Sequence, residues 1–348
     1  MLVKEFDFPL PPELIAQRPL ERRDDSRMMV VRRKEGTFEH ARFRDFPGCL
    51  GQTGERPDLL VLNDTRVIPA RIYGRRNGTL VEFLLFRNRG PGTWETMCRP
   101  ARKIRTGDRV DFPGGLEAEV VETGQEGHRV LKFSTADVLG RLEAIGFAPL
   151  PPYIKRPKND EAGRPGDLAR YQTTYAEKDG AIAAPTAGLH FTPETLVQLD
   201  GRGIETVRVT LHVGLATFQP LRVDRIEDHR MLEETYTVSE ETAAAIGRAR
   251  AEGRPVTAVG TTVVRTLESA ARTEGARPLA PGTRGTSIFI YPGFEFKIVD
   301  RLLTNFHLPQ STLVMLVSAF AGRDLIMAAY AEAVREKYRF FSYGDCML

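Results

Sequence analysis

Four short segments of the sequence place histidine, threonine, asparagine or acidic side chains within or close after a strand-like apolar run. Histidine can accept or donate a proton near neutral pH, and the free N–H groups at the start of a helix can bind an anion. Ligands of α/β proteins favour such positions, because the carboxyl ends of parallel strands meet at one edge of the sheet. The four segments are therefore candidates for acid–base chemistry and ligand binding.

The first segment covers residues 184–193 and reads Ala-Pro-Thr-Ala-Gly-Leu-His-Phe-Thr-Pro. Its closing Thr-Pro pair is typical of a helix start. The small residues around Thr186 and Gly188 would let a ligand approach the backbone, and His190 stands at the mouth of the expected helix. The spacing alone leaves two interpretations open, a histidine that transfers protons or one that merely packs beside a helix cap.

The second segment is an expected strand at Glu205–Val213. Alternation along a strand puts Arg208, Thr210 and His212 on one face and the apolar residues on the other. His212 therefore faces away from the most apolar surface, just before a glycine-containing stretch. Without further support, a single histidine on a strand is more often a surface or satisfied residue than a catalytic one.

The third segment, residues 256–268, predicts an apolar strand that enters a helix through a tight turn. The turn consists of Gly260, Thr261 and Thr262. Its exposed N–H groups and the positive end of the helix dipole suit a carboxylate or a phosphate. Arg265 and Glu268 share one face of the helix. A local ion pair beside a capping threonine would explain the same pattern.

The fourth segment, residues 303–312, predicts the end of an apolar strand followed by a strongly apolar helix that we expect in the core. Between them lie Asn305, Phe306 and His307, a mixture of polar and aromatic groups that could bind a purine or a ribose. The histidines of the chain show no metal-ligand spacing such as H-E-x-x-H, so we expect no catalytic metal.

Composition narrows the class of protein. The chain has 348 residues, 41% hydrophobic and 27% charged, which is enough for two globular domains. Its net charge of +3 is compatible with a nucleic-acid partner without demanding one. Cys49, Cys98 and Cys346 are odd in number and lack a C-x-x-C pair, which favours a reducing compartment. Without an apolar signal region or a membrane-spanning apolar run, we expect a cytoplasmic protein.

The sequence pattern changes between residues 67 and 153, where short runs of alternating apolar and polar residues are separated by turns containing glycine. This spacing is typical of a small antiparallel β-barrel. On either side strands and helices alternate, with further strands expected at 288–291 and 297–303. We therefore predict a discontinuous α/β domain at 1–66 and 154–348, interrupted by a β-barrel domain at 67–153.

Five motifs that span almost the whole chain resemble those of the S-adenosylmethionine:tRNA ribosyltransferase-isomerases. They are Val61–Arg71, Ala184–Thr192, Val259–Thr262, Leu303–Pro309 and Tyr338–Asp345. The resemblance implies a larger α/β domain interrupted by a β-barrel. Three positions depart from the family pattern: His229 lacks a second histidine shortly after it, Ala216 replaces a glycine and Gly285 replaces a tryptophan. P-loop, nucleophile-elbow and Rossmann signatures are missing from the sequence.

The resemblance implies transfer and isomerisation of the ribosyl moiety of S-adenosylmethionine onto the 7-aminomethyl-7-deazaguanine base at the tRNA wobble position. This step of queuosine biosynthesis gives epoxyqueuosine-tRNA and releases adenine and methionine. S-adenosylmethionine would be a co-substrate, with no tightly bound cofactor, and tRNA would present its anticodon loop. Two alternatives stay open: a tRNA methyltransferase of unusual fold, which would release S-adenosylhomocysteine, and a non-catalytic RNA-binding protein.

Such a reaction needs a base for the acidified C5′ proton, a proton donor to adenine and acidic groups that offset the sulfonium. We expect His190 and His212 to transfer protons, with His307 as a third candidate. Glu268 and Asp228 are the expected partners of the sulfonium or the ribose hydroxyls. The expected S-adenosylmethionine-binding residues are Thr186, Gly188, Gly260, Thr261, Thr262, Arg265, Asn305 and His307.

Anions have two expected sites. The turn at residues 260–262, with Arg265, would hold the methionine carboxylate or a tRNA phosphate. Two basic clusters within residues 67–153 could line an anticodon stem, although they could equally be a solvated face. These clusters are Arg71, Arg75 and Arg76, and Arg99, Arg102, Lys103 and Arg105.

Overall fold

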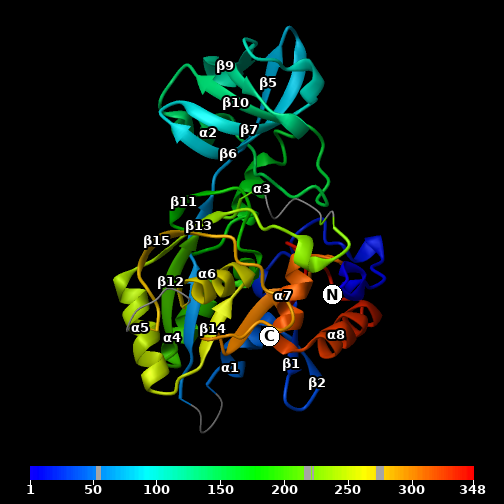
Figure 1. The fold of residues 1–348 in the computed structure, drawn as a ribbon, viewed down its shortest axis with the longest axis vertical. Helices are drawn as coiled ribbons and strands as arrows, with labels where there is room; N and C mark the ends of the chain where they lie inside the picture. Colours follow the sequence, from blue (N-terminus) through cyan, green and yellow to red (C-terminus); the bar gives the residue numbers. More distant parts are fainter. Residues whose placement is uncertain (52–55, 215–220, 222, 272–277) are drawn as a thin grey trace.

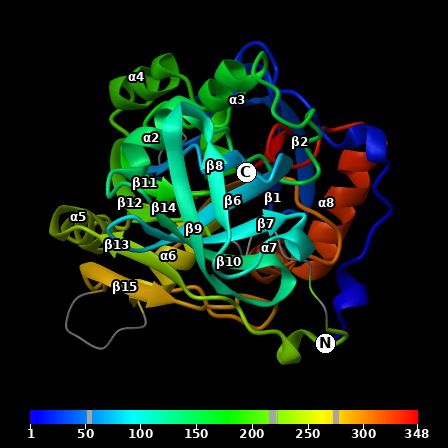
Figure 2. The same cartoon turned by 90° about the horizontal axis from the view of Figure 1, so that it is seen from above.

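The chain folds into two parts, a larger α/β body and a closed β-barrel at one end of it (Figure 1). The computed structural model describes residues 1–51, 56–214, 221, 223–271 and 278–348. Seen from above, the barrel overlies the middle of the body (Figure 2). The architecture confirms the fold class expected from the sequence, an α/β body with an antiparallel barrel.

The body is built on a nine-stranded mixed sheet. In pairing order its strands are β15 (Gly282–Thr286), β13 (Glu234–Val238), β12 (Glu205–Leu211), β3 (Leu59–Asn63), β14 (Val256–Val259), β16 (Arg301–Asn305), β17 (Cys346–Met347), β1 (Arg27–Arg32) and β2 (Thr37–Arg42). The four middle strands, β12, β3, β14 and β16, run parallel to one another. Their carboxyl ends therefore lie along one edge of the sheet.

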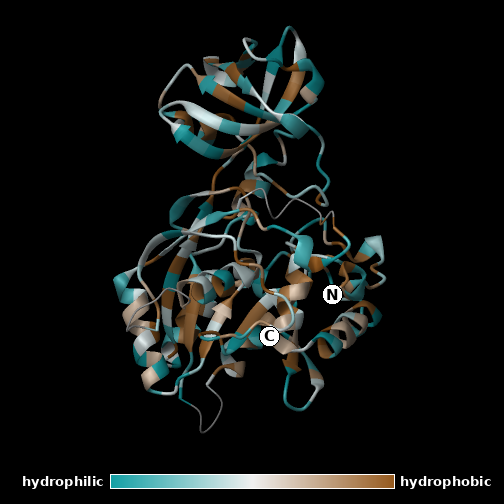
Figure 3. Ribbon diagram, in the orientation of Figure 1, coloured by the Kyte–Doolittle hydropathy of each residue, from teal (hydrophilic) through white to brown (hydrophobic). Residues whose placement is uncertain are grey.

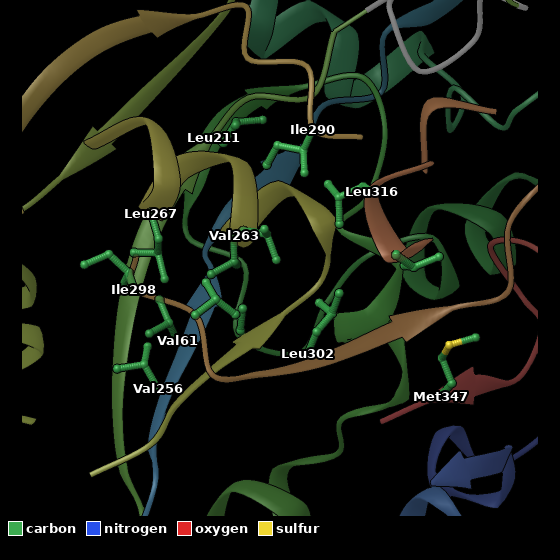
Figure 4. Packing of buried hydrophobic residues seen from close by; sticks show 14 of the residues in the cluster. Val61, Leu211, Val256, Val263, Leu267, Ile290, Ile298, Leu302, Leu316 and Met347 are labelled. Atoms are coloured by element: carbon green, nitrogen blue, oxygen red, sulfur yellow. The ribbon is translucent and has the colours of Figure 1, made fainter. Parts of the chain in front are cut away.

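The middle strands are apolar because both faces of the sheet are covered. Leu59 and Val61 of β3 pack into one hydrophobic cluster, together with α5 (Glu240–Ala251), α6 (Thr261–Ala271), α7 (Thr312–Ala321) and α8 (Arg323–Arg335). Leu60 and Leu62 pack on the opposite side, with α1 (Phe46–Cys49) and α4 (Pro193–Gly201). Apolar residues concentrate along these strands (Figure 3), and Val61, Val263 and Leu302 lie in the shared core (Figure 4).

The barrel closes through six antiparallel strands. In order around the barrel they are β10 (His128–Phe133), β7 (Thr93–Arg99), β6 (Thr79–Gly90), β5 (Arg71–Arg76), β8 (Arg109–Phe112) and β9 (Leu116–Thr123). Inward-facing side chains such as Phe83, Val110 and Leu131 form a separate hydrophobic cluster. The helix α2 (Val138–Ile145) follows β10 and adds Val138 and Leu142 to that cluster.

A two-stranded parallel sheet, formed by β4 (Thr65–Val67) and β11 (Lys178–Ala181), connects the two parts. The helix α3 (Arg164–Arg170) lies in the segment that returns from the barrel to the body. We propose that the inserted domain comprises residues 67–153 and that the α/β domain comprises 1–66 and 154–348.

The strand expected at 288–291 is wrong, and the one expected at 297–303 begins only at Arg301. Ile290 packs into the core without a strand partner. The N–H groups of residues 297–299 bind the carboxylate of Glu268 on α6 instead of a neighbouring strand. The Glu268 carboxylate thus takes the place of the strand-to-strand hydrogen bonds that the apolar pattern suggested.

Within the described residues, no single helix has the length and apolarity needed to cross a membrane. The helices α7 and α8 reach that length and composition only as a pair, and the chain bends by 118° between them.

A glycine in the barrel provides a test of the packing. A Cβ atom at Gly74 of β5 would lie 2.5 Å from Val110 Cγ1 and 2.7 Å from the ring of Phe112. We expect Gly74→Ala to lower the free energy of unfolding by about 1–3 kcal/mol, because the core must shift to admit the methyl group. Gly48→Ala, where nothing lies within 4 Å of the new atom, is the control. Equal thermal unfolding of the two variants would contradict the packing described for Gly74.

Candidate active site

The carboxyl ends of the four parallel strands bring three of the predicted segments to one edge of the sheet. His212 follows β12, Gly260 follows β14, and Asn305 is the last residue of β16. The fourth predicted segment forms a short 3-10 helix, η8 (Thr186–His190), which packs against the end of β16. From the same edge, β3 leads through β4 into the barrel (Figure 1).

Asn63, the last residue of β3, organises this edge. Its amide nitrogen donates to Leu211 O at 3.0 Å and to Thr262 Oγ1 at 3.2 Å. Its amide oxygen accepts from the N–H groups of Leu211 at 3.1 Å and Thr65 at 3.2 Å. The fully buried side chain thereby joins the end of β12, the start of α6 and β4. Sequence reasoning missed this residue, although an asparagine directly after a buried strand was a usable signal.

His190 is held in one orientation by two hydrogen bonds. Its Nε2 lies 3.3 Å from Asn305 Oδ1, and its Nδ1 lies 2.7 Å from Ser26 Oγ. Because Asn305 donates with its own nitrogen to Phe341 O, its oxygen faces the ring and Nε2 must donate to it. Nδ1 is then the unprotonated nitrogen and accepts from the Ser26 hydroxyl. The ring also lies against Phe43, with centroids 5.4 Å apart.

Burial lowers the pKa of His190 to about 4, although its hydrogen bond to Asn305 opposes the shift. The nearby guanidinium groups of Arg23 and Arg339 lower the pKa further, because they repel an imidazolium. The imidazole is therefore neutral at physiological pH, with its lone pair on Nδ1. In chemical terms it is a proton acceptor.

A small cavity, partly open to solvent, lies beside His190. Ser26 and His190 form part of its wall, and Arg23, Arg170, Arg339 and Tyr343 are among its other lining residues. Of the residues predicted from the sequence to bind or react, only His190 lines this cavity. His212, Thr262 and His307 are not among the residues that line it.

His212 lies at the same sheet edge in its own polar surroundings. Its Nδ1 is 2.8 Å from Thr65 Oγ1. Burial lowers its pKa, while the nearby carboxylates of Asp64 and Asp179 oppose the shift. A Cβ atom at Gly180 would come within 2.9 Å of the ring, so the glycine leaves room for the imidazole. This half-buried histidine can still exchange a proton with a group outside the core.

Two predicted residues of α6 serve mainly to hold other segments. The fully buried carboxylate of Glu268 accepts from the N–H groups of Lys297, Ile298 and Val299 at 2.9, 3.1 and 3.0 Å. Arg265 forms a buried ion pair with Glu234. Its Nε and Nη2 atoms have no partner. The alternative interpretation, a local ion pair between Arg265 and Glu268, is therefore not supported by the contacts of these two described residues.

The other candidates differ in exposure. His307 is buried, lies 2.8 Å from Thr304 Oγ1 through Nε2, and has its pKa lowered by burial to about 3. Asp228 is exposed on the 3-10 helix η10 (Ile226–Asp228).

The turn before α6 lies close to η8. Gly260 has a φ of 93°, donates to Leu303 O and lies close to Ala187. Thr261 is buried, and Thr262 is held by the asparagine of β3. In η8, a Cβ atom at Gly188 would lie 2.1 Å from the hydroxyl oxygen of Tyr175, whereas Thr186 is half-buried. Ala216, one of the departures from the family pattern, lies outside the described residues.

The body with its polar strand-end edge and the inserted barrel define a two-part α/β enzyme with a buried histidine beside a basic cavity. The chain belongs to the family described as "Queuosine biosynthesis protein", whose model matches residues 3–348.

Similar proteins match along their whole length. A protein of Moorella thermoacetica named S-adenosylmethionine:tRNA ribosyltransferase-isomerase is 50% identical over 353 residues, covering 100% of this chain and 99% of that protein. One of the same name from Halothermothrix orenii is 49% identical, with the same coverage. The crystal structure of S-adenosylmethionine tRNA ribosyltransferase from Thermotoga maritima is 41% identical, covers 99% of both chains and has a TM-score of 0.56.

The role of Glu268 can be tested by an isosteric change. We expect Glu268→Gln to lower the free energy of unfolding by about 2–4 kcal/mol, because an amide has one acceptor oxygen and turns N–H groups toward backbone donors. Urea unfolding measures the effect. The control is Glu295→Gln, which changes an exposed carboxylate near the same segment. Equal unfolding midpoints for both variants would remove Glu268 as an anchor.

The buried histidines predict how stability depends on pH. The folded-state pKa values of His190 and His307, about 4 and about 3, lie below the ordinary value of 6.5. Above pH 6.5 both histidines are neutral in the folded and the unfolded chain, and stability is complete. Between pH 6.5 and about 4 only the unfolded chain takes up the protons, so the folded state loses stability as the pH falls. Each would cost about 1.4 kcal/mol per pH unit in this window.

Urea unfolding of the wild type and of His307→Gln at several pH values provides the measurement. As the pH falls, we expect the free energy of unfolding of the variant to decrease less steeply than that of the wild type, by about 1.4 kcal/mol per pH unit. Parallel curves for the two proteins would contradict the neutral, buried state of His307.

Proposed function

We propose that this enzyme transfers and isomerises the ribosyl moiety of S-adenosylmethionine onto the 7-aminomethyl-7-deazaguanine base at the tRNA wobble position. The products are epoxyqueuosine-tRNA, adenine and methionine, and the step belongs to queuosine biosynthesis. Full-length similarity at about half identity to proteins named for this activity carries the proposal. The buried neutral histidine beside a basic cavity supports it.

His190 is our first candidate for proton transfer. The sulfonium of S-adenosylmethionine acidifies the neighbouring C5′ protons, so a neutral base placed next to that carbon can remove one. The lone pair on Nδ1 points at the Ser26 hydroxyl, which itself lines the cavity. The serine hydroxyl can therefore pass a proton to the imidazole, which spares the base direct contact with solvent.

His212 is our candidate for the second proton transfer, to the adenine that departs. It is less buried than His190, and Asp64 and Asp179 favour its charged form. Asp64 accepts from Thr210 Oγ1 at 2.6 Å and carries a nearly buried carboxylate at the same edge. Such a carboxylate can offset the positive sulfonium.

The remaining proposed roles concern binding. We propose that Thr186, Gly188, the turn at 260–262 and Asn305 form the wall on which S-adenosylmethionine lies as a co-substrate. Arg265, with two nitrogens free of partners, would receive its carboxylate. His307 and Glu268 would hold this S-adenosylmethionine-binding surface in place from the protein interior. Asp228 remains a proposed partner of the ribose hydroxyls, from an exposed position.

The proposed macromolecular partner is tRNA, which would enter with its anticodon loop. In the barrel, Arg99, Arg102, Lys103 and Arg105 are exposed, as a phosphate-contacting cluster requires. Arg71 and Arg76 are instead paired with carboxylates of the barrel itself. The proposed location is the cytoplasm, where tRNA is modified and where the three free cysteines would stay reduced.

Adenine release from S-adenosylmethionine in the presence of precursor tRNA tests the proposal. We expect His190→Gln and His212→Gln each to lower turnover by about 10²–10⁴-fold, because each removes a proton-transfer group. His40→Gln is the control, since His40 lies on the outer strand β2, where its Nδ1 forms a hydrogen bond with the Tyr338 hydroxyl. Formation of S-adenosylhomocysteine instead of adenine would identify a methyltransferase. Near-normal turnover by both variants would remove the two histidines from the mechanism.

A further inference from the structure

The cavity beside His190 brings together three arginines from distant parts of the chain. Arg23 precedes β1, Arg170 ends α3, and Arg339 follows α8. Tyr343 from the carboxyl-terminal segment completes this wall. None of the four was a candidate on sequence grounds. We call Arg23, Arg170, Arg339 and Tyr343 the arginine wall.

The three guanidinium groups are fixed in place without being neutralised. Arg23 donates to the backbone oxygens of Ala169 and Leu189, both at 3.0 Å. Arg170 donates to backbone oxygens in the segment before β1, and Arg339 donates to another in that segment. No carboxylate forms a salt bridge with any of the three within the described ranges of the chain. Backbone dipoles therefore orient the charges but leave the wall with a net positive charge.

The nearby carboxylates are engaged elsewhere. Asp345 accepts from the backbone N–H groups of Arg27 and Arg339 at 2.9 and 2.8 Å. Asp167 accepts from Nε and Nη2 of Arg156 at 2.8 and 2.9 Å. Neither can turn toward the cavity without giving up two hydrogen bonds. Both carboxylates are therefore already engaged, and a ligand can supply further negative charge to the arginine wall.

Three buried donors of the wall have no hydrogen-bond partner among the residues that the structure describes. They are Arg170 Nε, Arg339 Nη1 and the hydroxyl of Tyr343. An unsatisfied buried donor destabilises a protein, so three in one wall indicate a missing acceptor. Burial lowers the pKa of Arg339 and raises that of Tyr343, which shows that water compensates these groups poorly. An anion with several oxygens would satisfy all three donors together.

We propose that the arginine wall binds a backbone phosphodiester of the tRNA, next to the base that reacts. This inference rests on the proposed function, because it assumes a tRNA substrate. A phosphodiester has one negative charge and two free oxygens that accept from several donors, and arginine is well suited to it.

The net charge of S-adenosylmethionine makes its binding at the arginine wall unfavourable. Its carboxylate is outweighed by an ammonium and a sulfonium, so the molecule is a net cation that three guanidinium groups repel. A single carboxylate also needs only one arginine for bidentate binding. The phosphate is therefore assigned to the arginine wall, and the methionine part of S-adenosylmethionine to the strand ends, with its ribose toward Ser26 and His190.

The position of the wall places the phosphate close to the proposed base. His190 and Ser26 line the same cavity, so the nucleotide that carries the phosphate lies within reach of the imidazole. An anion there would also offset the charges of Arg23 and Arg339, which now disfavour the protonated form of His190. Binding of tRNA would thereby make the imidazole a stronger base.

Two conservative variants test the wall, Arg339→Gln and Tyr343→Phe. The control is Arg33→Gln, because Arg33 is an exposed arginine that also donates to two backbone oxygens, those of Phe320 and Asp300, away from the cavity. Affinity for precursor tRNA is measured at several salt concentrations, and affinity for S-adenosylmethionine is measured separately by equilibrium dialysis. We expect a loss of about tenfold or more in tRNA affinity for Arg339→Gln and a salt slope smaller by about one.

For Tyr343→Phe we expect weaker tRNA binding together with unchanged or higher stability, because an unsatisfied hydroxyl is removed from the unliganded protein. The control should keep wild-type affinity and slope. Unchanged tRNA affinity and slope in both wall variants would overturn the proposal. A loss of S-adenosylmethionine affinity with tRNA binding intact would overturn it in favour of a carboxylate site.

Inorganic phosphate separates the wall from the proposed function. At equal ionic strength, phosphate should raise the melting temperature of the wild type and of Arg33→Gln more than that of the two wall variants. If the wild type neither binds tRNA nor releases adenine, the proposed function fails and this inference falls with it, even where the phosphate effect marks an anion site. Equal stabilisation of all four proteins by phosphate would overturn the anion site itself.

Discussion

The edge of the sheet depends on one buried amide side chain. Asn63 uses both hydrogens and both acceptor positions of its amide, which no other residue of its size can do. These bonds fix the end of β12 and the first turn of α6 relative to β3. Because β3 continues into β4 and the barrel, the same side chain also sets where the chain leaves the body. The position of His212 and of the turn at 260–262 follows from this constraint.

The buried and half-buried arginines of the body have two kinds of partner, carboxylates and backbone oxygens. Arg265 is paired with Glu234, and that ion pair is sealed beneath the strand ends. The arginines beside His190 are held only by backbone oxygens and face a cavity. A buried charge without a counter-ion is costly, so it persists where a ligand supplies the opposite charge in the working state. The contrast distinguishes an arginine that a carboxylate already neutralises from arginines whose opposite charge a ligand would supply.

Local patterns predicted that β12, β14 and β16 end at or next to His212, Gly260 and Asn305, because an apolar run that stops at polar residues is a property of neighbouring positions. The same patterns wrongly predicted a strand at 288–291. They could not predict Glu268 as an anchor, because its partners are backbone groups almost thirty positions away. The arginine wall was missed for the same reason, since only the folded chain brings Arg23 and Tyr343 together.

The separation of the two proposed sites has a consequence for the order of chemistry. An enzyme that deprotonates S-adenosylmethionine without a tRNA base present would waste the co-substrate. Burial above all, and the guanidinium groups of Arg23 and Arg339 in addition, hold His190 in its weakly basic state. A phosphate in the cavity would cancel that field and strengthen the base only when the acceptor base is also in place. The charge of tRNA would then act as the signal that its own modification can begin.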